Sequence, residues 1–327
     1  MTKHKKIKIC LACSAGGHLQ EMLQLESVYK KHTHFFISFK RIDTESLSKK
    51  ELFYCIERPA RNPAKTIKNF VQTLKILQKE NPDLIISTGA DVALASCFIG
   101  KLLGKKVIFI ESFCRPIKPG ITGKLIYQIA DLFLYQWKAL KKYYKKGIYS
   151  GSIFQEKSKS KTKDFGKGIF LSVGTHPQQF NRLLKIIDDL IEKKIIKEKV
   201  FAQIGASDYK PKHFDYERFI ELNEFEQKIK KCSLFITHAG EGNIGLALNL
   251  GKKMLVMPRL KKFDEHTNNH QLELADAIEK EKLALIAHNE NELKTALAKI
   301  KNFNLNQNKL KGSSIKLIND FIKQNFK

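Results

Sequence analysis

The sequence contains no long apolar segment, which argues against a protein with membrane-spanning helices. No apolar run approaches the roughly 18 residues that a membrane-spanning helix needs. The opening residues MTKHKKIKICLAC lead from a basic stretch directly into a strand pattern, without the apolar region and small-residue cleavage site of a signal peptide. We therefore expect a cytoplasmic protein with no membrane-spanning helix.

Closely paired cysteines of the metal-binding kind are also absent. The six cysteines are scattered, mostly in apolar segments, and their spacing is not that of a metal site. The segment CLAC, Cys10 to Cys13, has the spacing of a redox motif, but it lies within a predicted strand, where residues three apart point to opposite faces. We expect buried, reduced thiols.

Acidic residues are too few to balance the basic ones: 33 Asp and Glu against 59 Lys and Arg give a formal net charge of +26. Such a charge favours an anionic partner, which could be nucleic acid, a membrane face or a phosphorylated substrate. An AT-rich genome, which raises the Lys content throughout, is the alternative explanation. Helix-turn-helix, zinc-finger and interleaved aromatic patterns are missing, so we expect no nucleic-acid partner. The lysines concentrate at Lys138, Lys141, Lys142, Lys145, Lys146, Lys157, Lys159, Lys161 and Lys163.

The length and the pattern of the chain predict two α/β domains. At 327 residues, the chain exceeds the size at which one hydrophobic core usually keeps growing. Short apolar runs (IKICLA, HFFISF, DLIIST, KVIFIE) alternate with helix-period segments. One such segment, Pro63 to Gln78, places five apolar residues on one helical face: Ile67, Phe70, Val71, Leu74 and Leu77. This alternation predicts a parallel sheet.

A polar segment interrupts the alternation at residues 154–168, FQEKSKSKTKDFGKG, and is typical of a solvated linker. The pattern then resumes with the predicted strands GIFLSV, KVFAQI, SLFITH, KMLVMP and LALIA. We therefore expect two doubly wound halves. In such sheets ligands bind at the carboxyl ends of the strands, so the crevice between the halves is the expected place for chemistry.

The turn ACSAGGHLQEML is the candidate anion site of the first half. Gly16 and Gly17 follow a strand and precede a helix, whose N-terminal amides and dipole favour negative charge. The turn is neither a G-x-G-x-x-G fingerprint nor a P-loop, which disfavours nicotinamide and ATP, and a plain tight turn is the alternative. His18, next to it, can accept a proton from a hydroxyl near neutral pH, or it can be a capping or packing histidine.

Two segments of the second half carry the candidate nucleotide-binding groups. The turn THAGEGN gives backbone amides at a helix start, near His238, Gly240 and Gly242. The stretch PRLKKFDEHTNNHQLELA concentrates side chains that can bind sugar hydroxyls: Arg259, Glu265, His266, Asn268, Asn269, His270 and Gln271. A zinc site is the rival interpretation, but it would need a third ligand and the H-E-x-x-H arrangement is missing.

In this order, the motifs closely resemble those of one glycosyltransferase family over nearly the whole chain. The first half resembles the acceptor-binding subunit of the two-subunit UDP-N-acetylglucosamine transferase of the dolichol pathway, through SAGGHL, ERPAR, STGAD, FIESFCRP and ITGKLIYQIADLFLYQW. The second half resembles the donor-binding subunit, through VGTHPQQFNRL, QIGASDYKP, FITHAGEGN and MPR…EHTNNHQ. Bacterial capsule and exopolysaccharide pathways have similar pairs, and this chain is similar to a fused bacterial relative of such a pair.

The resemblance implies a GT-B fold, in which two Rossmann-like domains face a central cleft. Residues 1–153 would bind the lipid-linked acceptor at the membrane, residues 154–168 would form the linker, and residues 169–327 would bind the UDP-sugar. The implied acceptor-binding residues are Gly16, Gly17, Arg58, Arg61, Thr88, Gly89, Ser112 and Arg115. The implied donor-binding residues are Gly174, Thr175, His176, Gln203, Gly205, His238, Gly240, Gly242, Asn243, Arg259, Glu265, His266, Asn269, His270 and Gln271.

The implied reaction is inverting transfer from a UDP-sugar to a polyprenyl-diphosphate-linked saccharide, in the synthesis of a capsule, an exopolysaccharide or another surface glycan. His18 is the expected general base, with Glu111 as its orienting partner or its replacement. No metal or other cofactor is expected, since GT-B enzymes dispense with a catalytic metal and the sequence offers no suitably placed D-x-D pair. Glycine-turn amides and Arg259 would stabilise the departing UDP.

The sequence departs from the family pattern in two ways, which affect the expected membrane binding and the expected donor binding. Eukaryotic acceptor subunits usually begin with a membrane anchor, which this sequence does not show, so we expect peripheral binding to the anionic inner face of the cell membrane. Leu246 stands where many donor domains of the superfamily carry a glutamate on the nucleotide ribose. The ribose contacts and the donor sugar therefore stay open.

Two rival functions remain. A UDP-sugar 2-epimerase shares the architecture but would use no acceptor lipid, so its products would distinguish it. A non-catalytic membrane scaffold would show no sugar transfer at all. The sequence leaves the sugars, the linkage and the oligomeric state open.

Overall fold

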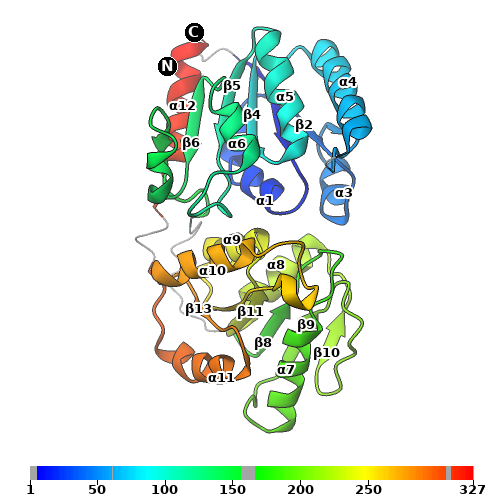
Figure 1. Ribbon diagram of the computed structural model, residues 1–327, viewed down its shortest axis with the longest axis vertical. Coiled ribbons are helices and arrows are strands. Elements are labelled where there is room, and N and C mark those ends of the chain that lie inside the picture. The colour runs from blue at the N-terminus through cyan, green and yellow to red at the C-terminus, as the bar shows by residue number, and fades with distance from the viewer. Residues whose placement is uncertain (1–5, 61, 156–165, 307–310, 327) are drawn as a thin grey trace. The chain divides into compact units, whose positions relative to one another are not determined.

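The chain divides into two compact units in the computed structural model, which describes residues 6–60, 62–155, 166–306 and 311–326. Met1–Ile153 together with Lys311–Lys327 form unit 1, and Phe154–Leu310 form unit 2. Each unit is built on one parallel β-sheet (Figure 1). Among the described residues, no helix combines the length and the apolar character that crossing a membrane requires.

Unit 1 contains a seven-stranded sheet in the order β3-β2-β1-β4-β5-β6-β7, and all its strand pairs are parallel. The strands are β1 (Lys8–Cys13), β2 (Thr33–Ser38), β3 (Phe53–Cys55), β4 (Leu84–Gly89), β5 (Lys106–Ile110), β6 (Leu132–Tyr135) and β7 (Ile148–Tyr149). The helices are α1 (Gly17–Leu23), α2 (Glu26–Tyr29), α3 (Ile42–Ser48), α4 (Pro63–Glu80), α5 (Asp91–Leu102), α6 (Ile121–Ile126), the 3-10 helix η1 (Lys138–Lys142) and α12 (Ser314–Asn325).

Unit 2 contains a six-stranded parallel sheet in the order β10-β9-β8-β11-β12-β13. The strands are β8 (Ile169–Ser172), β9 (Val200–Gln203), β10 (Asp215–Glu217), β11 (Leu234–His238), β12 (Met254–Met257) and β13 (Leu285–Ile286). The helices are α7 (Asn181–Glu192), α8 (Leu222–Lys231), α9 (Glu241–Asn249), η2 (Lys261–Phe263), α10 (His270–Lys280), α11 (Glu290–Lys299) and η3 (Ile300–Asn302).

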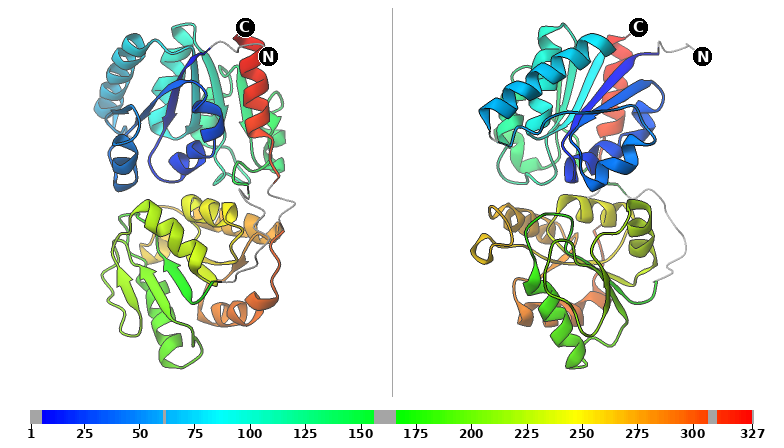
Figure 2. Two further views of the ribbon diagram at one scale, coloured as in Figure 1. Left: turned by 180° about the vertical axis from the view of Figure 1, so that it is seen from behind. Right: turned by 90° about the vertical axis from the view of Figure 1, so that its right-hand side faces the viewer.

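Helices cover both faces of each sheet, which is why the central strands are apolar on both sides. In unit 1, α4, α5 and α6 cover one face and α12 lies on the other (Figures 1 and 2). In unit 2, α7 and α11 pack on the face that carries Leu171 and Ile236. Phe225 of α8 packs on the opposite face, against Phe170 and Phe235. The predicted pair of doubly wound α/β domains is confirmed.

The end of the chain departs from the predicted division. We expected residues 169–327 to form one domain, but residues 311–327 belong to unit 1. The Ser313 amide donates to the Ser150 carbonyl at 2.6 Å, and Ile318 and Ile322 of α12 are buried. The pattern of α12 predicts a helix but carries no information about which sheet the helix covers. Most of the expected linker, residues 156–165, lies outside the described residues.

The orientation of α4 also differs from the simplest interpretation of its sequence. Of the five apolar residues that share a predicted face, Leu77 is buried, whereas Ile67, Val71 and Leu74 are 66%, 48% and 37% exposed. The helix buries Asn69 and Thr73 instead. Two hydrogen bonds to the backbone of Glu57 hold the helix in this orientation. The side-chain amide of Asn69 donates to the Glu57 backbone carbonyl at 2.7 Å. The side-chain oxygen of Gln72 accepts from the Glu57 backbone amide at 2.8 Å.

Candidate active site

The carboxyl edge of the unit 1 sheet brings together β1 and β4, between which the strand order reverses. Ligands of doubly wound sheets bind at this point. After β1, Gly16 takes a φ of +89°, which an L side chain rarely adopts, and turns the chain into α1. His18 is the second residue of α1 and is therefore held at the reversal point by the strand–turn–helix geometry.

His18 is fixed by a reciprocal pair of hydrogen bonds with Thr88 at the end of β4. Its Nδ1 lies 2.8 Å from the Thr88 carbonyl oxygen, and the Thr88 hydroxyl donates to the His18 carbonyl at 2.7 Å. A carbonyl oxygen only accepts, so Nδ1 carries the proton and the Nε2 of the neutral ring is left as the accepting nitrogen. Gly89 has a φ of +110°, which an L side chain rarely adopts, and a Cβ there would be in van der Waals contact with the His18 ring, 3.4 Å from Cε1.

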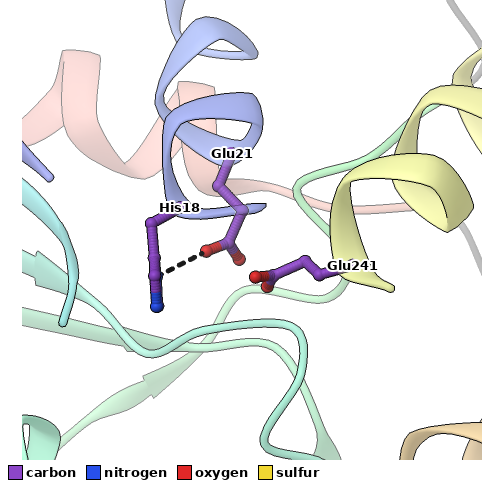
Figure 3. A group of neighbouring side chains, drawn as sticks. All are labelled: His18, Glu21 and Glu241. Atoms are coloured by element: carbon purple, nitrogen blue, oxygen red, sulfur yellow. Dashed lines mark ion pairs between the residues drawn. The ribbon is translucent and has the colours of Figure 1, made fainter. Parts of the chain in front are cut away.

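The carboxylate that faces His18 belongs to Glu21, one helical turn further along α1 (Figure 3). Glu21 Oε2 lies 3.5 Å from His18 Nδ1, and the Glu21 side chain is fully buried. Its Oε1 accepts from the Phe113 amide at 2.8 Å and from Gln136 Nε2 at 2.5 Å. The sequence analysis missed Glu21, although its i, i+3 spacing from His18 is the signal that could have identified it.

We predicted that Glu111 orients His18 or replaces it as the base, but the carboxylate of Glu111 contacts other residues. Its carboxylate accepts from the Tyr144 hydroxyl, from the Ser112 amide at 3.2 Å and from the Gly120 amide at 3.3 Å. Burial raises the pKa of Glu111, although Tyr144 and the two amides act in the opposite direction. The orienting position beside His18 is thus taken by Glu21, and Glu111 ties the loop after β5 to α6 and η1.

Several predicted acceptor-binding residues have structural partners. The Gly16 amide donates to the Asp43 carboxylate, so an internal anion already lies on the turn. Ser112 is buried, and its hydroxyl lies 3.1 Å from Cys114 Sγ. Arg58 is exposed, with its guanidinium over the Phe39 ring at 5.1 Å. Gly17 and Arg115 are partly exposed, and Arg61 lies outside the described residues.

In unit 2 the strand order reverses between β8 and β11, and a buried histidine lies at this point. Gly174 and Gly240 flank the imidazole of His238 so closely that a Cβ on either would clash with it. Burial, followed by the charge of Arg259, lowers the pKa of His238 well below its usual value, so the ring is neutral at physiological pH. The two predicted glycines are therefore needed for the packing of His238.

A side-chain network lies next to His238. The Ser172 hydroxyl accepts from Gln203 Nε2 at 3.2 Å, from Asn243 Nδ2 at 3.1 Å and from the Gly174 amide at 3.2 Å. Asn243 also donates to Thr237 Oγ1 at 2.8 Å. The structure thus brings the predicted residues Gln203 and Asn243 together, through Ser172, which the sequence analysis did not single out.

Arg259 does not fit the role that we predicted for it on the departing UDP. Its side chain is fully buried, and its guanidinium donates to the carbonyls of Val173, Gln178 and Glu265 at 2.5, 2.7 and 3.0 Å. Burial lowers the pKa of Arg259 to about 10. Arg259 therefore holds the loop after β8 against the loop after β12, and its charge acts on His238 from a distance.

Glu265 is likewise engaged within unit 2. Its carboxylate forms a two-point ion pair with Arg182, with both nitrogen–oxygen distances 2.8 Å, and it accepts from the Leu260 amide at 2.9 Å. Arg182 also donates to the carbonyls of Pro258 and His288. The predicted contact of Glu265 with sugar hydroxyls is replaced by this pairing, and Arg182 is a further residue that the sequence analysis missed.

Some of the remaining predicted donor-binding residues are engaged in contacts within unit 2, and others are exposed. Gln271 Oε1 accepts from the Arg259 amide at 3.0 Å, and Asn269 Oδ1 accepts from the Lys261 amide at 3.1 Å. The rings of His176 and His266 stack, with centroids 5.0 Å apart, and burial lowers the pKa of His266. Gly205 has a φ of +54°, and a Cβ there would meet the Gly174 carbonyl. The partly or fully exposed members of the predicted donor set are Thr175, His176, Gly240, Gly242, Asn243, His266, Asn269 and His270.

Comparison with known proteins finds a matching family model for each half of the sequence. Residues 9–153 match the model of the family "Oligosaccharide biosynthesis protein Alg14 like". Residues 168–324 match the model of the "Glycosyltransferase family 28 C-terminal domain". The human UDP-N-acetylglucosamine transferase subunit ALG14 is 25% identical over 190 residues, which cover 47% of this chain and 86% of the relative.

Longer matches cover both units. The UDP-N-acetylglucosamine--N-acetylmuramyl-(pentapeptide) pyrophosphoryl-undecaprenol N-acetylglucosamine transferase of Prochlorococcus marinus subsp. pastoris is 23% identical over 295 residues, covering 83% of this chain and 79% of the relative. The crystal structure of Acinetobacter baumannii MurG shares the fold, with a TM-score of 0.61 at 15% identity, over 98% of this chain and all of that one.

These findings and the two doubly wound units define a glycosyltransferase of the GT-B fold. Within that class, the chain joins an Alg14-like domain and a glycosyltransferase family 28 C-terminal domain in one polypeptide. The predicted family resemblance is confirmed.

Proposed function

We propose that the protein transfers a sugar from a UDP-sugar to a saccharide linked to a polyprenyl diphosphate, with inversion at the anomeric carbon. An acceptor hydroxyl attacks that carbon, the bond between the carbon and the diphosphate oxygen breaks, and UDP leaves. The proton of the hydroxyl passes to His18 Nε2. We place this reaction in the synthesis of a bacterial surface glycan such as a capsule or an exopolysaccharide.

The observation that carries the proposal is the protonation pattern of His18. The contact of Nδ1 with the Thr88 carbonyl at 2.8 Å leaves Nε2 as the proton acceptor. The ring is 22% exposed, so a substrate hydroxyl can reach it, while the buried Glu21 carboxylate lies on the opposite nitrogen. A histidine held in this way has the properties of a general base near neutral pH.

The UDP-sugar is proposed to bind at the carboxyl edge of the unit 2 sheet. The family 28 match of this unit supports the assignment. Of the predicted donor residues, we retain as ligand contacts those that are partly or fully exposed, apart from Gly240: Thr175, His176, Gly242, Asn243, His266, Asn269 and His270. Arg259 and Glu265 hold the loops that carry them, and Gly174 and Gly240 accommodate His238.

No metal ion or other cofactor is proposed to take part. Backbone amides at the start of α9 and the helix dipole would stabilise the charge that develops on the UDP leaving group. Transfer activity should therefore survive EDTA.

The protein is proposed to bind peripherally to the anionic inner face of the cell membrane, where a polyprenyl-linked acceptor resides. Its net charge of +26 supports this location. The exposed apolar residues of α4 and the lysines beside them offer a surface for it.

The test is to offer the purified protein a panel of UDP-sugars together with short polyprenyl-diphosphate saccharides, with products identified by mass spectrometry. We expect one UDP-sugar to extend the acceptor by one sugar with inverted configuration. Conversion of the UDP-sugar to its 2-epimer, without extension of the acceptor, would instead identify an epimerase. The absence of both products would favour a non-catalytic scaffold.

A further inference from the structure

Glu21 is held more tightly than a carboxylate on the first turns of a helix usually is. It lies on α1, and its side chain is fully buried. Its Oε1 accepts from the Phe113 amide at 2.8 Å and from Gln136 Nε2 at 2.5 Å. A buried carboxylate is costly unless such donors compensate for the lost water, so this arrangement indicates a specific role.

The orientation of the Gln136 amide is set by its other contacts. Gln136 Oε1 accepts from the Ile153 amide at 2.8 Å, so its nitrogen must point the other way, toward Glu21 Oε1 and the Glu111 carbonyl. Oε1 of Glu21 is thereby committed to two donors. The second oxygen, Oε2, is the one that lies 3.5 Å from His18 Nδ1.

We propose that Glu21 is the positioning residue of the reaction, whose charge stabilises the imidazolium that forms when Nε2 takes the acceptor proton, while the Thr88 carbonyl keeps the proton of the neutral ring on Nδ1. Gln136 and the Phe113 amide hold Glu21 in place for this role. The inference deepens the proposed function, since it rests on His18 as the base. It assigns to Glu21 the orienting role that the sequence suggested for Glu111.

The geometry predicts what Glu21→Gln would do. The carbonyl oxygen of the new amide would take the place of Oε1, because the Phe113 amide and Gln136 Nε2 both donate there. Its NH2 group would then lie where Oε2 lies now and would face the N–H of His18 Nδ1. The Thr88 carbonyl would still accept from Nδ1, so the neutral ring should keep its proton there, but the imidazolium would face a donor in place of a negative charge and should form less readily.

The experiment compares the wild type with Glu21→Gln in two measurements. Nitrogen-15 NMR of the histidine rings over a pH series, with His18→Asn used to assign the signal, should show that His18 takes up its second proton at lower pH in Glu21→Gln than in the wild type. In the transfer assay, kcat should fall roughly 10²-fold or more while KM changes little, because a base whose imidazolium is destabilised still binds substrate. Glu21→Asp, which keeps a carboxylate, should recover part of the loss.

The control is Glu26→Gln, which removes a carboxylate from an exposed ion pair with Lys30 on α2 and should leave both measurements unchanged. An unchanged pH titration of the His18 signal in Glu21→Gln, or a kcat within a fewfold of the wild type, would overturn the inference. If the wild type transferred no sugar, the proposed function would fail, while the NMR comparison would still decide whether Glu21 sets the protonation of His18.

Discussion

Two buried carboxylates of unit 1 differ in what surrounds them, and this difference separates their roles. Glu21 faces a histidine nitrogen at 3.5 Å, whereas Glu111 accepts from a tyrosine hydroxyl and two backbone amides. Burial raises the pKa of Glu111, which means that its charged form is less favourable in the folded state than in the unfolded chain. Removing the charge of Glu111 should therefore disturb the protein less than removing the ring of His18.

We expect His18→Ala to lower kcat by roughly 10²- to 10⁴-fold, the usual range for a positioned general base. UDP binding should be retained, because the donor is assigned to unit 2. Glu111→Gln places an NH2 group against one of the amide donors of Glu111 and should lower stability, but it should cost less activity than His18→Ala. Steady-state kinetics and UDP titration calorimetry on both variants would check this order. A nearly inactive Glu111→Gln beside an active His18→Ala would move the base role to Glu111.

Individual residue roles could be predicted from the sequence only in part. His18 could be recognised, because a glycine turn at a strand end places it at the sheet edge. The roles of Arg259 and Glu265 could not, because a charged residue in a polar loop is as compatible with ligand binding as with an internal pairing. Burial decides between the two, and it depends on Arg182 and on carbonyls distant in the sequence.

At the scale of elements, α4 shows why an apolar face need not be a buried face. Its residues Ile67, Val71 and Leu74, spaced i, i+4 and i+7, share an exposed stripe. Three exposed lysines, Lys68, Lys75 and Lys79, lie along one side of the stripe. The strand and helix positions could be predicted from periodicity, but the rotation of α4 depends on hydrogen bonds to Glu57, which periodicity does not report.

This stripe should contribute to membrane binding. Replacing Ile67, Val71 and Leu74 together by Gln should weaken binding to anionic liposomes roughly 10²-fold, because each side chain contributes about 1 kcal/mol when it leaves water. Sedimentation at low salt would measure the effect. Binding of the wild type should also fall steeply as salt rises, since each lysine near an anionic surface contributes about 1 kcal/mol.

The matched control for the stripe is Ile121→Gln with Leu125→Gln, which removes the exposed apolar residues of α6. Further along the same apolar segment, Leu132, Phe133 and Leu134 are buried, so Ile121 and Leu125 are the residues of this segment that a membrane could reach. Full binding by the α4 variant together with loss by the α6 variant would transfer the contact to α6. Pelleting that does not depend on salt would argue against an electrostatic contribution.

At the scale of the whole molecule, the chain returns to unit 1 after it has formed unit 2. The alternation of strands and helices predicts two parallel sheets, and the Ser- and Lys-rich segment marks where the first sheet ends. The last helix nevertheless follows unit 2 in the sequence and belongs to unit 1. An amphipathic helix needs an apolar surface to cover, and the surface left open lies on the sheet of unit 1.

If α12 belongs to unit 1, removing one of its buried side chains should lower the stability of that unit. The single tryptophan, Trp137, lies in unit 1, where its Nε1 donates to the Phe113 carbonyl at 2.7 Å, so its fluorescence reports the unfolding of that unit. Ile318 of α12 is fully buried. Ile318→Ala should destabilise unit 1 by roughly 2–5 kcal/mol, the usual cost of removing a buried isoleucine side chain, and should shift the fluorescence transition in urea to lower concentration.

The comparison for this variant is Leu293→Ala, which removes an equally buried side chain from α11 in unit 2. It should leave the tryptophan transition in place and shift only the part of the circular-dichroism change that belongs to unit 2. The reverse result, with Ile318→Ala changing the unit 2 transition and sparing the tryptophan signal, would restore the division at residues 169–327 that the sequence alone suggested. The two variants thus distinguish a helix that completes unit 1 from one that merely extends unit 2.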